Sequence, residues 1–452
     1  MTRRDLLQVP AAALLARQAS AAATLRPNIV FVLADDLGYG DLGCYGQKQI
    51  QTPNLDRMAA EGLRFTQAYS GSTVCAPSRC CLMTGRHTGH ATVRGNIKPE
   101  AGLRPEETTV ASLLKGAGYQ TALFGKWGLG GPGTGSVPNA RGFDEFYGYL
   151  NQQHAHNSYP EHLWDNQNES FLTGNWFDQR KQFSNDLFTE RALKFVAGAR
   201  QPFFLYLTYT IPHANNELTA VRGNGMETPD DKPYHDLPWP QVERNFASLV
   251  TRMDSDVGRL LAALKTAGQE QNTLVIFTSD NGPHQEGGHK PEFFQSSGPF
   301  RGIKRDLYDG GVRVPFIARW PGMVPAAKSS DQVHAFWDFL PTAAELAGVA
   351  PPRGLDGISM LPALLGKPQP QQHDYLYWEF HENRFAQAIR TGNHKCFRRN
   401  PAERIEVYDL AADPGERMNI ADKSPDLVRR AEGLFRTART DSPLFPVKPG
   451  RA

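Results

Sequence analysis

One stretch of this 452-residue chain could do unusual chemistry, because Cys75 to Gly85 reads C-A-P-S-R-C-C-L-M-T-G. A free cysteine is most often a buried packing residue, but the fixed residue types around Cys75 favour a chemical role. Cys80 and Cys81 lie in an expected helix from Ser78 to Thr84 and are interpreted as buried. The amino end of that helix would place a positive dipole beside the reacting group.

Several apolar, β-branched runs end directly in polar residues that could bind ions. The run Asn28–Ala34 predicts a strand buried on both faces, and Asp35-Asp36 follow it. Two adjacent carboxylates favour a hard cation with oxygen ligands, and the alternative is a turn that caps a helix. Expected strands at 119–124, 202–209 and 273–278 are followed in the same way by Lys126, His213, Asp280 and Asn281.

Strands alternate with helices through most of the chain, a pattern typical of a layered α/β sheet. The expected helices include residues 52–61, 105–115 and 242–267. In such sheets ligands bind beyond the carboxyl ends of the strands. We therefore expect the polar residues at the strand ends to meet Cys75 at one edge, where a bound cation could polarise a substrate oxygen.

The length of the chain suggests one large domain with a smaller one attached. We predict a catalytic domain over residues 26–348, a Pro-rich joint over 349–372 and a small α+β domain over 373–445. The formal net charge of +2 does not indicate a nucleic-acid partner. The five cysteines have no regular spacing, so at most one or two disulfides are expected, and none is an equal possibility.

The first 23 residues are typical of a twin-arginine export signal. Arg3 and Arg4 precede a short apolar run from Val9 to Ala16 and a stretch rich in alanine. An ordinary mature N-terminus is the alternative. The apolar run is too short to span a bilayer, and no later segment is a candidate membrane span. We therefore expect an exported protein, periplasmic or secreted.

Together these motifs resemble those of type I sulfatases in the alkaline phosphatase superfamily. The matching stretches are N-I-V-F-V-L-A-D-D, C-A-P-S-R, G-K-W, the strand ending in P-H, S-D-N-G, K-R-D-L-Y-D-G-G-V-R-V-P, D-F-L-P-T and V-Y-D-L-A-A-D-P-G-E. The resemblance implies a large mixed, mostly parallel sheet sandwiched by helices, with a smaller C-terminal α+β domain. It also implies hydrolysis of a sulfate ester, and with the export signal it favours a sulfated carbohydrate or small molecule.

In such enzymes a formylglycine-generating enzyme oxidises the motif cysteine, here Cys75, to formylglycine. The hydrated aldehyde is a geminal diol, and one of its hydroxyls attacks the sulfur of the ester. The second hydroxyl then lets the covalent intermediate collapse to the aldehyde, which expels sulfate. A serine would instead remain trapped as a stable sulfate ester.

The resemblance also implies roles for individual residues. The ligands of Ca2+, with Mg2+ as an alternative, would be Asp35, Asp36, Cys75, Asp280 and Asn281. Arg79 would hold and polarise the diolate, while Lys126 and Lys304 would bind sulfate and stabilise the leaving oxygen. His213 would be a sulfate ligand and a candidate general acid.

One position departs from the family motif. Many members read G-K-W-H-L-G, where the histidine helps to deprotonate the diol, but this chain has Gly128 there. His154 and His156 could supply an imidazole or contact the substrate, and on a strand they would share one face. The alternative is that they lie in a surface loop.

Two other functions remain open at this stage. A formylglycine-dependent phosphonate or phosphodiester hydrolase would use a transition metal and additional histidine ligands, whereas the ligand set here is rich in oxygen. An inactive homologue that binds sulfated glycans would be consistent with Gly128.

Overall fold

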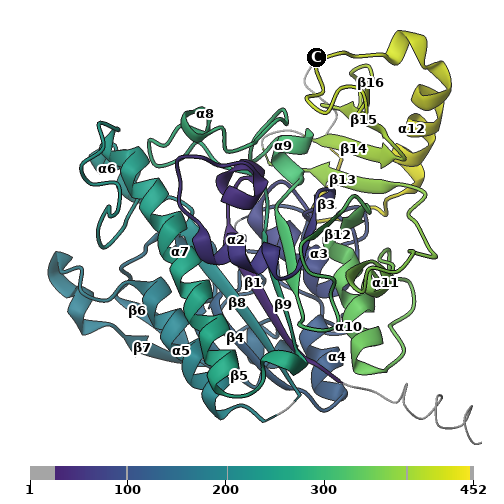
Figure 1. The fold of residues 1–452 in the computed structure, drawn as a ribbon. Helices are drawn as coiled ribbons and strands as arrows, with labels where there is room; N and C mark the ends of the chain where they lie inside the picture. Colours follow the sequence, from purple (N-terminus) through teal and green to yellow (C-terminus); the bar gives the residue numbers. More distant parts are fainter. Residues whose placement is uncertain (1–25, 98–99, 201, 383–384, 448–452) are drawn as a thin grey trace, which may run out of the picture.

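The structure is a computed structural model that describes residues 26–97, 100–200, 202–382 and 385–447 (Figure 1). The predicted export signal, residues 1–23, lies outside the described residues. Among the described residues, no helix combines the length and the apolarity needed to cross a bilayer.

In the described part of the chain, ten strands form one large sheet in the order β11-β2-β10-β9-β1-β8-β4-β5-β6-β7. In that order they are β11 (Lys328–Ser330), β2 (Leu63–Phe65), β10 (Phe316–Arg319), β9 (Thr273–Ser279), β1 (Asn28–Asp35), β8 (Phe203–Pro212), β4 (Gln120–Lys126), β5 (Glu145–Tyr149), β6 (His162–Asp165) and β7 (Asn168–Phe171). The central strands β9, β1, β8, β4 and β5 are parallel to one another. β10, β6 and β7 pair antiparallel, so the predicted mixed, mostly parallel sheet is confirmed.

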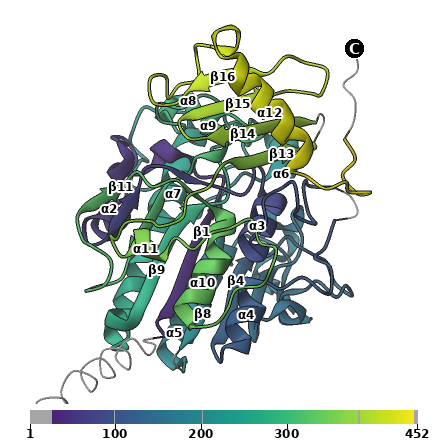
Figure 2. The ribbon, with the colours of Figure 1, turned by 90° about the vertical axis from the view of Figure 1, so that its right-hand side faces the viewer.

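The central strand β1 is buried on both faces, and its side chains alternate between two apolar layers. Phe31 and Leu33 belong to one layer, whereas Val30 and Val32 belong to the other. The first layer is covered by α3 (Cys75–Thr84), α4 (Val110–Gly116) and α10 (Phe339–Ala347), as Figure 2 shows. The second is covered by α2 (Pro53–Ala60), α5 (Ser184–Gly198) and α7 (Gln241–Thr266) (Figure 1).

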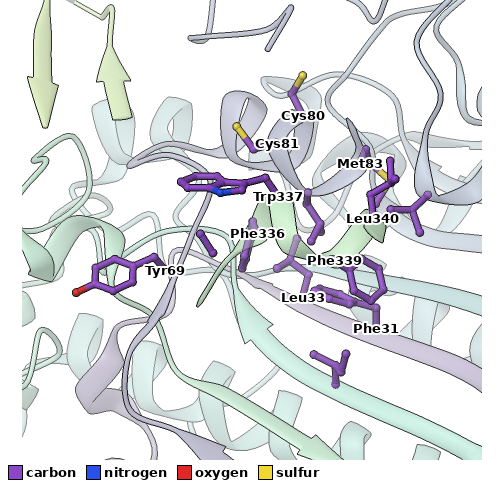
Figure 3. Packing of buried hydrophobic residues seen from close by; sticks show 14 of the residues in the cluster. Phe31, Leu33, Tyr69, Cys80, Cys81, Met83, Phe336, Trp337, Phe339 and Leu340 are labelled. Atoms are coloured by element: carbon purple, nitrogen blue, oxygen red, sulfur yellow. The ribbon is translucent and has the colours of Figure 1, made fainter. Parts of the chain in front are cut away.

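The layer under α3 and α10 fixes the position of the helix that carries the cysteine motif. Phe31 on β1 packs against Phe339, with ring centroids 4.5 Å apart, and Figure 3 shows both beside Leu340 and Met83. Cys80 and Cys81 are fully buried on α3, as the sequence predicts. All five cysteines are free thiols.

A smaller antiparallel sheet forms the C-terminal part and confirms the predicted α+β unit. It contains β13 (Leu376–Phe380), β14 (Ala386–Thr391), β15 (His394–Arg398) and β16 (Glu406–Asp409), and α12 (Pro425–Thr437) packs on it (Figure 2). Trp378 donates its indole N–H to the carbonyl of Ser70 at 3.0 Å. Lys395 forms a buried ion pair at 2.8 Å with Asp309, on α9 (Asp309–Val312). These contacts attach the small sheet to the loop that precedes α3 and to α9.

Some elements differ from the sequence predictions. The expected helix 105–115 begins only at Val110, because the Thr109 side chain accepts the N–H of Ser112 and caps the helix there. The expected helix from Ser78 begins at Cys75, and the short strand β3 (Ala68–Tyr69) lies between β2 and this helix. The remaining short elements are β12 (His334–Ala335), which pairs with β3, α6 (Asn216–Arg222), α8 (Pro291–Phe294) and α11 (Leu361–Leu364).

Candidate functional site

Four neighbouring parallel strands bring their carboxyl ends together at one edge of the large sheet. β1 ends at Asp35 and β4 ends at Lys126. His213 directly follows β8, and Asp280 directly follows β9. All four side chains are buried. The parallel order β9-β1-β8-β4 therefore places them beside one another, as expected for this class of sheet.

Cys75 is the first residue of α3 and lies against this edge. Its side chain is buried, and Sγ donates to Oδ1 of Asp35 at 3.3 Å. Burial, reinforced by the negative charge of Asp35, raises the pKa of the Cys75 thiol well above its ordinary value. An unmodified Cys75 would thus remain a neutral thiol, which is a poor nucleophile.

Arg79 lies one turn after Cys75 and connects α3 to two strand ends. Its Nε and one terminal nitrogen donate to Oδ2 of Asp280 at 3.1 and 2.8 Å, and the other terminal nitrogen donates to the carbonyl of Lys126 at 2.8 Å. Because the guanidinium is rigid and buried, these bonds fix its orientation. The arginine thereby fixes the distance between the helix start and the ends of β4 and β9.

Two buried lysines neutralise the adjacent aspartates. Lys126 Nζ donates to Asp35 Oδ2 at 2.7 Å, and Lys304 Nζ donates to Asp36 Oδ2 at the same distance. Burial raises the pKa of Asp35, but the charges of Lys126 and of the other nearby cations outweigh it and hold the pKa well below its ordinary value. Burial lowers the pKa of Lys304, but Asp36 and Glu286 raise it well above its ordinary value. All four groups are therefore charged at neutral pH.

His213 faces the same cluster with its Nε2 atom. Its Nδ1 lies 2.7 Å from the carbonyl of Ala214, to which only an N–H can donate, so Nε2 accepts from Lys304 Nζ at 3.0 Å. Burial and the charge of Lys304 lower the pKa of His213 to about 3. The imidazole is therefore neutral here, with its lone pair directed at Lys304.

The acidic residues of this cluster fit a hard divalent cation. Asn281 donates its amide N–H to Asp36 Oδ1 at 2.7 Å, and its Oδ1 is buried without a hydrogen-bond partner among the described residues. Burial, with the charge of Asp35 as the second cause, raises the pKa of Asp280 to about 7. An orphaned amide oxygen beside three buried carboxylates is the donor set that Ca2+ and Mg2+ prefer.

A hollow of 890 Å3 opens in front of this cluster. Cys75, His213 and Lys304 line it, together with residues from several loops. Its size is that of an ordinary small-ligand pocket.

His156 and His154 lie in a 3-10 turn (His154–His156) and not on a strand, so they do not share a face. His156 lines the hollow, and its ring stacks on that of His213 with centroids 4.8 Å apart. Its Nδ1 lies 3.0 Å from Oε2 of Glu217. His154 instead packs against Tyr149 and does not line this hollow.

The position of the missing motif histidine is filled by another side chain. Gly128 has a φ of +72°, and a Cβ there would lie 1.9 Å from Nε2 of Gln152. Gln152 lines the hollow and donates to the carbonyl of Gly128 at 3.3 Å. The glutamine thus occupies the space that a side chain at position 128 would need.

The sequence analysis missed three residues of this site: Gln152, Glu217 and Glu286. Glu286 accepts from Lys304 at 3.0 Å and also from Arg305, and so holds the lysine in place. All three lie in loops or at the start of a short helix, where no periodicity marks a functional position. Only the nearness of Glu286 to the S-D-N-G motif could have drawn attention to it.

Comparisons with known proteins agree with this geometry. Residues 27–349 match the model of the Sulfatase family, and residues 301–430 match that of the N-sulphoglucosamine sulphohydrolase C-terminal region. Human arylsulfatase A is 33% identical over 94% of this chain and 90% of its own length. Dog N-acetylgalactosamine-6-sulfatase is 35% identical over 77% of this chain, which spans about two thirds (67%) of that relative.

Solved structures share the fold. The Ps i-CgsB structure in complex with k-i-k-neocarrahexaose has a TM-score of 0.80 and 28% identity, and covers 93% of this chain and 95% of its own. The phosphonate monoester hydrolase of Agrobacterium radiobacter has a TM-score of 0.65 and 18% identity over 91% of this chain and 95% of its own. At that identity the likeness concerns the fold alone.

Proposed function

We propose that this chain removes sulfate from a carbohydrate with a nucleophile derived from Cys75. The chain belongs to the sulfatase family and is a sulfuric ester hydrolase, which is the premise of this proposal. The observation that carries the proposal is the buried Cys75 at the start of α3, in contact with Asp35 and beside Lys126 and Arg79. The sugar substrate is supported by two similar proteins, one named N-acetylgalactosamine-6-sulfatase and one solved in complex with k-i-k-neocarrahexaose.

We propose that a formylglycine-generating enzyme converts Cys75 to formylglycine, whose hydrate supplies the attacking hydroxyl. The surrounding residues already suit an oxygen nucleophile. Arg79 on α3 and Lys126 at the end of β4 both lie beside Asp35, which contacts Cys75, so their charges would stabilise a deprotonated hydroxyl there. The amino end of α3 adds a positive dipole at the same point.

A cation held by Asp35, Asp36, Asp280 and Asn281, together with the modified Cys75, would act as a Lewis acid toward a sulfate oxygen. We propose Ca2+, with Mg2+ as the alternative. Lys126 and Lys304 would bind the sulfate and stabilise negative charge on the oxygen that leaves. The charge of the sulfate would raise the pKa of His213, so that its Nε2 takes up a proton from solvent, hydrogen-bonds the sulfate and donates that proton to the leaving oxygen.

We further propose that His156 replaces the imidazole that the family motif has at position 128. His156 lines the hollow, stacks on His213 and is oriented by Glu217, so Nε2 is the atom left for proton transfer. Burial and the nearby charge of Lys126 lower the pKa of His156, which keeps it neutral and able to accept a proton. His154 packs against Tyr149 and lines the adjoining hollow, not the one in front of Cys75, so it is not a candidate for this proton transfer.

The two histidines give a matched test of that assignment. His156→Ala should lower kcat on an aryl sulfate by about 10²-fold, the contribution of one general base. His154→Ala should leave kcat on the same aryl sulfate close to the wild-type value, since His154 does not line the hollow in front of Cys75. Equal effects of the two variants, or full activity of His156→Ala, would reject the assignment.

The proposed reaction is tested by a substrate panel with purified protein and a Cys75→Ala control. We expect hydrolysis of sulfated sugars and aryl sulfates, abolished by Cys75→Ala, and much slower hydrolysis of phosphonate monoesters and phosphodiesters. Preference for phosphonates would favour the alternative hydrolase. Sulfated-glycan binding without hydrolysis by any preparation would favour the inactive homologue.

We also propose that the protein is exported through the twin-arginine pair Arg3-Arg4. The test is fractionation of the native host, comparing the wild type with an Arg3→Lys, Arg4→Lys double variant. The proposal is supported if the double variant stays in the cytoplasm while the wild type is exported. It is contradicted if the two proteins show the same distribution between fractions.

A further inference from the structure

A second hollow, of 540 Å3, adjoins the one in front of Cys75. Both are lined by Gln153 and Glu217, so these two side chains separate the hollows and face each of them. Glu217 is held in this position by His156 on the side of the first hollow. A molecule that fills the first hollow can therefore continue into the second only by passing over this pair.

The lining of the second hollow suits a sugar. It carries hydrogen-bonding side chains, among them Gln179, Asn157 and Arg222, next to the apolar Leu218 and Val221. Its charges are balanced, since the lining contains two arginines, Arg180 and Arg222, and two glutamates, Glu161 and Glu217. A sugar presents many hydroxyl groups on an apolar ring. Amides, cations that bind hydroxyl groups and small apolar patches, without a strong net charge, match these features.

The turn that supplies Gln179 also exposes aromatic rings. Phe177 is 90% exposed and Phe171 is 61% exposed, and Trp176 lies edge-on to Phe171 with ring centroids 6.3 Å apart. Single exposed apolar residues are ordinary, but three aromatics within one short segment mark a binding surface. Phe171 ends β7 and the other two rings follow it in the chain, so all three belong to the segment that leads to Gln179 without lining the hollow themselves; Figure 1 shows β7 beside β6.

We infer that the second hollow binds the sugar unit next to the one that carries the cleaved sulfate, so that the preferred substrate is an oligosaccharide. This inference rests on the proposed carbohydrate sulfatase function. The occupant is the continuing glycan chain, because the second hollow adjoins the first at the shared residues Gln153 and Glu217.

The test uses two substitutions on the same short helix, α6. Val221 is 81% exposed and lines the second hollow, whereas the neighbouring Ala220 is exposed and lines neither. Val221→Trp would fill the hollow, and Ala220→Trp adds the same ring outside it. The measured quantity is kcat/KM for a sulfated tetrasaccharide divided by kcat/KM for the matching sulfated monosaccharide, with an aryl sulfate as reference.

In the wild type we expect a ratio of about ten, the equivalent of about 1.4 kcal/mol of additional binding. Val221→Trp should bring the ratio close to one, mainly through KM, while Ala220→Trp should keep it. A wild-type ratio near one, or the same ratio in both variants, would overturn the inference. If no sulfated substrate of any length, aryl sulfate included, were hydrolysed, the proposed function itself would fail, which is a distinguishable outcome.

Discussion

Replacing Lys304 by methionine would remove one charge from the centre of the site while keeping a side chain of similar length. Lys304 Nζ has three partners within 3.0 Å: Asp36, Glu286 and the Nε2 of His213. It is also one of the residues that line the hollow with Cys75. The change would therefore affect both the charge balance of the site and the proposed stabilisation of the leaving oxygen.

The two effects can be estimated separately. Loss of one preorganised donor for developing negative charge lowers kcat by about 10²–10³-fold. Removing one partner of a buried ion pair costs about 3–5 kcal/mol of folding stability. Glu286 keeps Arg305 as a partner, so the uncompensated charge would be that of Asp36. A cation bound beside Asp36 would reduce this cost, so the loss of stability should be smaller when Ca2+ is present.

The assay is kcat on an aryl sulfate together with thermal unfolding, each with and without Ca2+. Arg305→Met is the control, because Arg305 also pairs with Glu286 but is 42% exposed and forms no ion pair with Asp36. We expect kcat to fall at least a hundredfold more in Lys304→Met than in Arg305→Met. A folded Lys304→Met variant with kcat within tenfold of the wild type would refute the role of this lysine.

Three further predictions concern the metal, acid stability and the altered motif. Chelation of divalent cations should abolish activity and lower the melting temperature, and Ca2+ at 100 times its Kd should restore about 2.7 kcal/mol. Burial raises the pKa of Glu379, but hydrogen bonding to His381 and the charge of Arg94 outweigh burial and lower the pKa from 4.5 to about 2. Because the folded-state pKa is the lower one, this carboxylate should contribute about 3 kcal/mol above pH 4.5, lost as the pH falls from 4.5 to 2, and Glu379→Gln should flatten that part of the stability profile. Gly128→His should lower stability by about 1–2 kcal/mol, because position 128 has a left-handed φ of +72° and Gln152 fills its side-chain space, and a simultaneous Gln152→Ala should recover part of the loss in thermal unfolding.

Much of the fold and the central cluster could be predicted because both follow from strands that are visible as apolar runs. β1 and β9 are continuous buried runs that end where the polarity changes, at Asp35 and at Asp280. Parallel strands place such ends at one edge, so the convergence of these residues is a consequence of topology. The start of α3 was predicted three residues late, since Cys75 and Pro77 carry no helical periodicity.

The walls of the hollow could not be predicted, because loops that lie far apart in the sequence form them. The two histidines at 154 and 156 share a face on a strand but not in the 3-10 turn that the chain forms, and local spacing does not distinguish these conformations. The pairing of His156 with Glu217 joins positions 61 residues apart. Nothing in either segment indicates this pairing, nor that Gln152 fills the space beside Gly128.

The central claim is that Cys75 becomes the nucleophile through conversion to formylglycine. Peptide mass spectrometry on protein from its native host tests it most directly, using the tryptic peptide from Phe65 to Arg79. Replacement of the CH2SH group by an aldehyde gives a defined mass loss and prevents alkylation of the thiol. We expect this modified peptide in the active protein, whereas an active protein in which Cys75 is entirely an ordinary thiol would contradict the proposed mechanism.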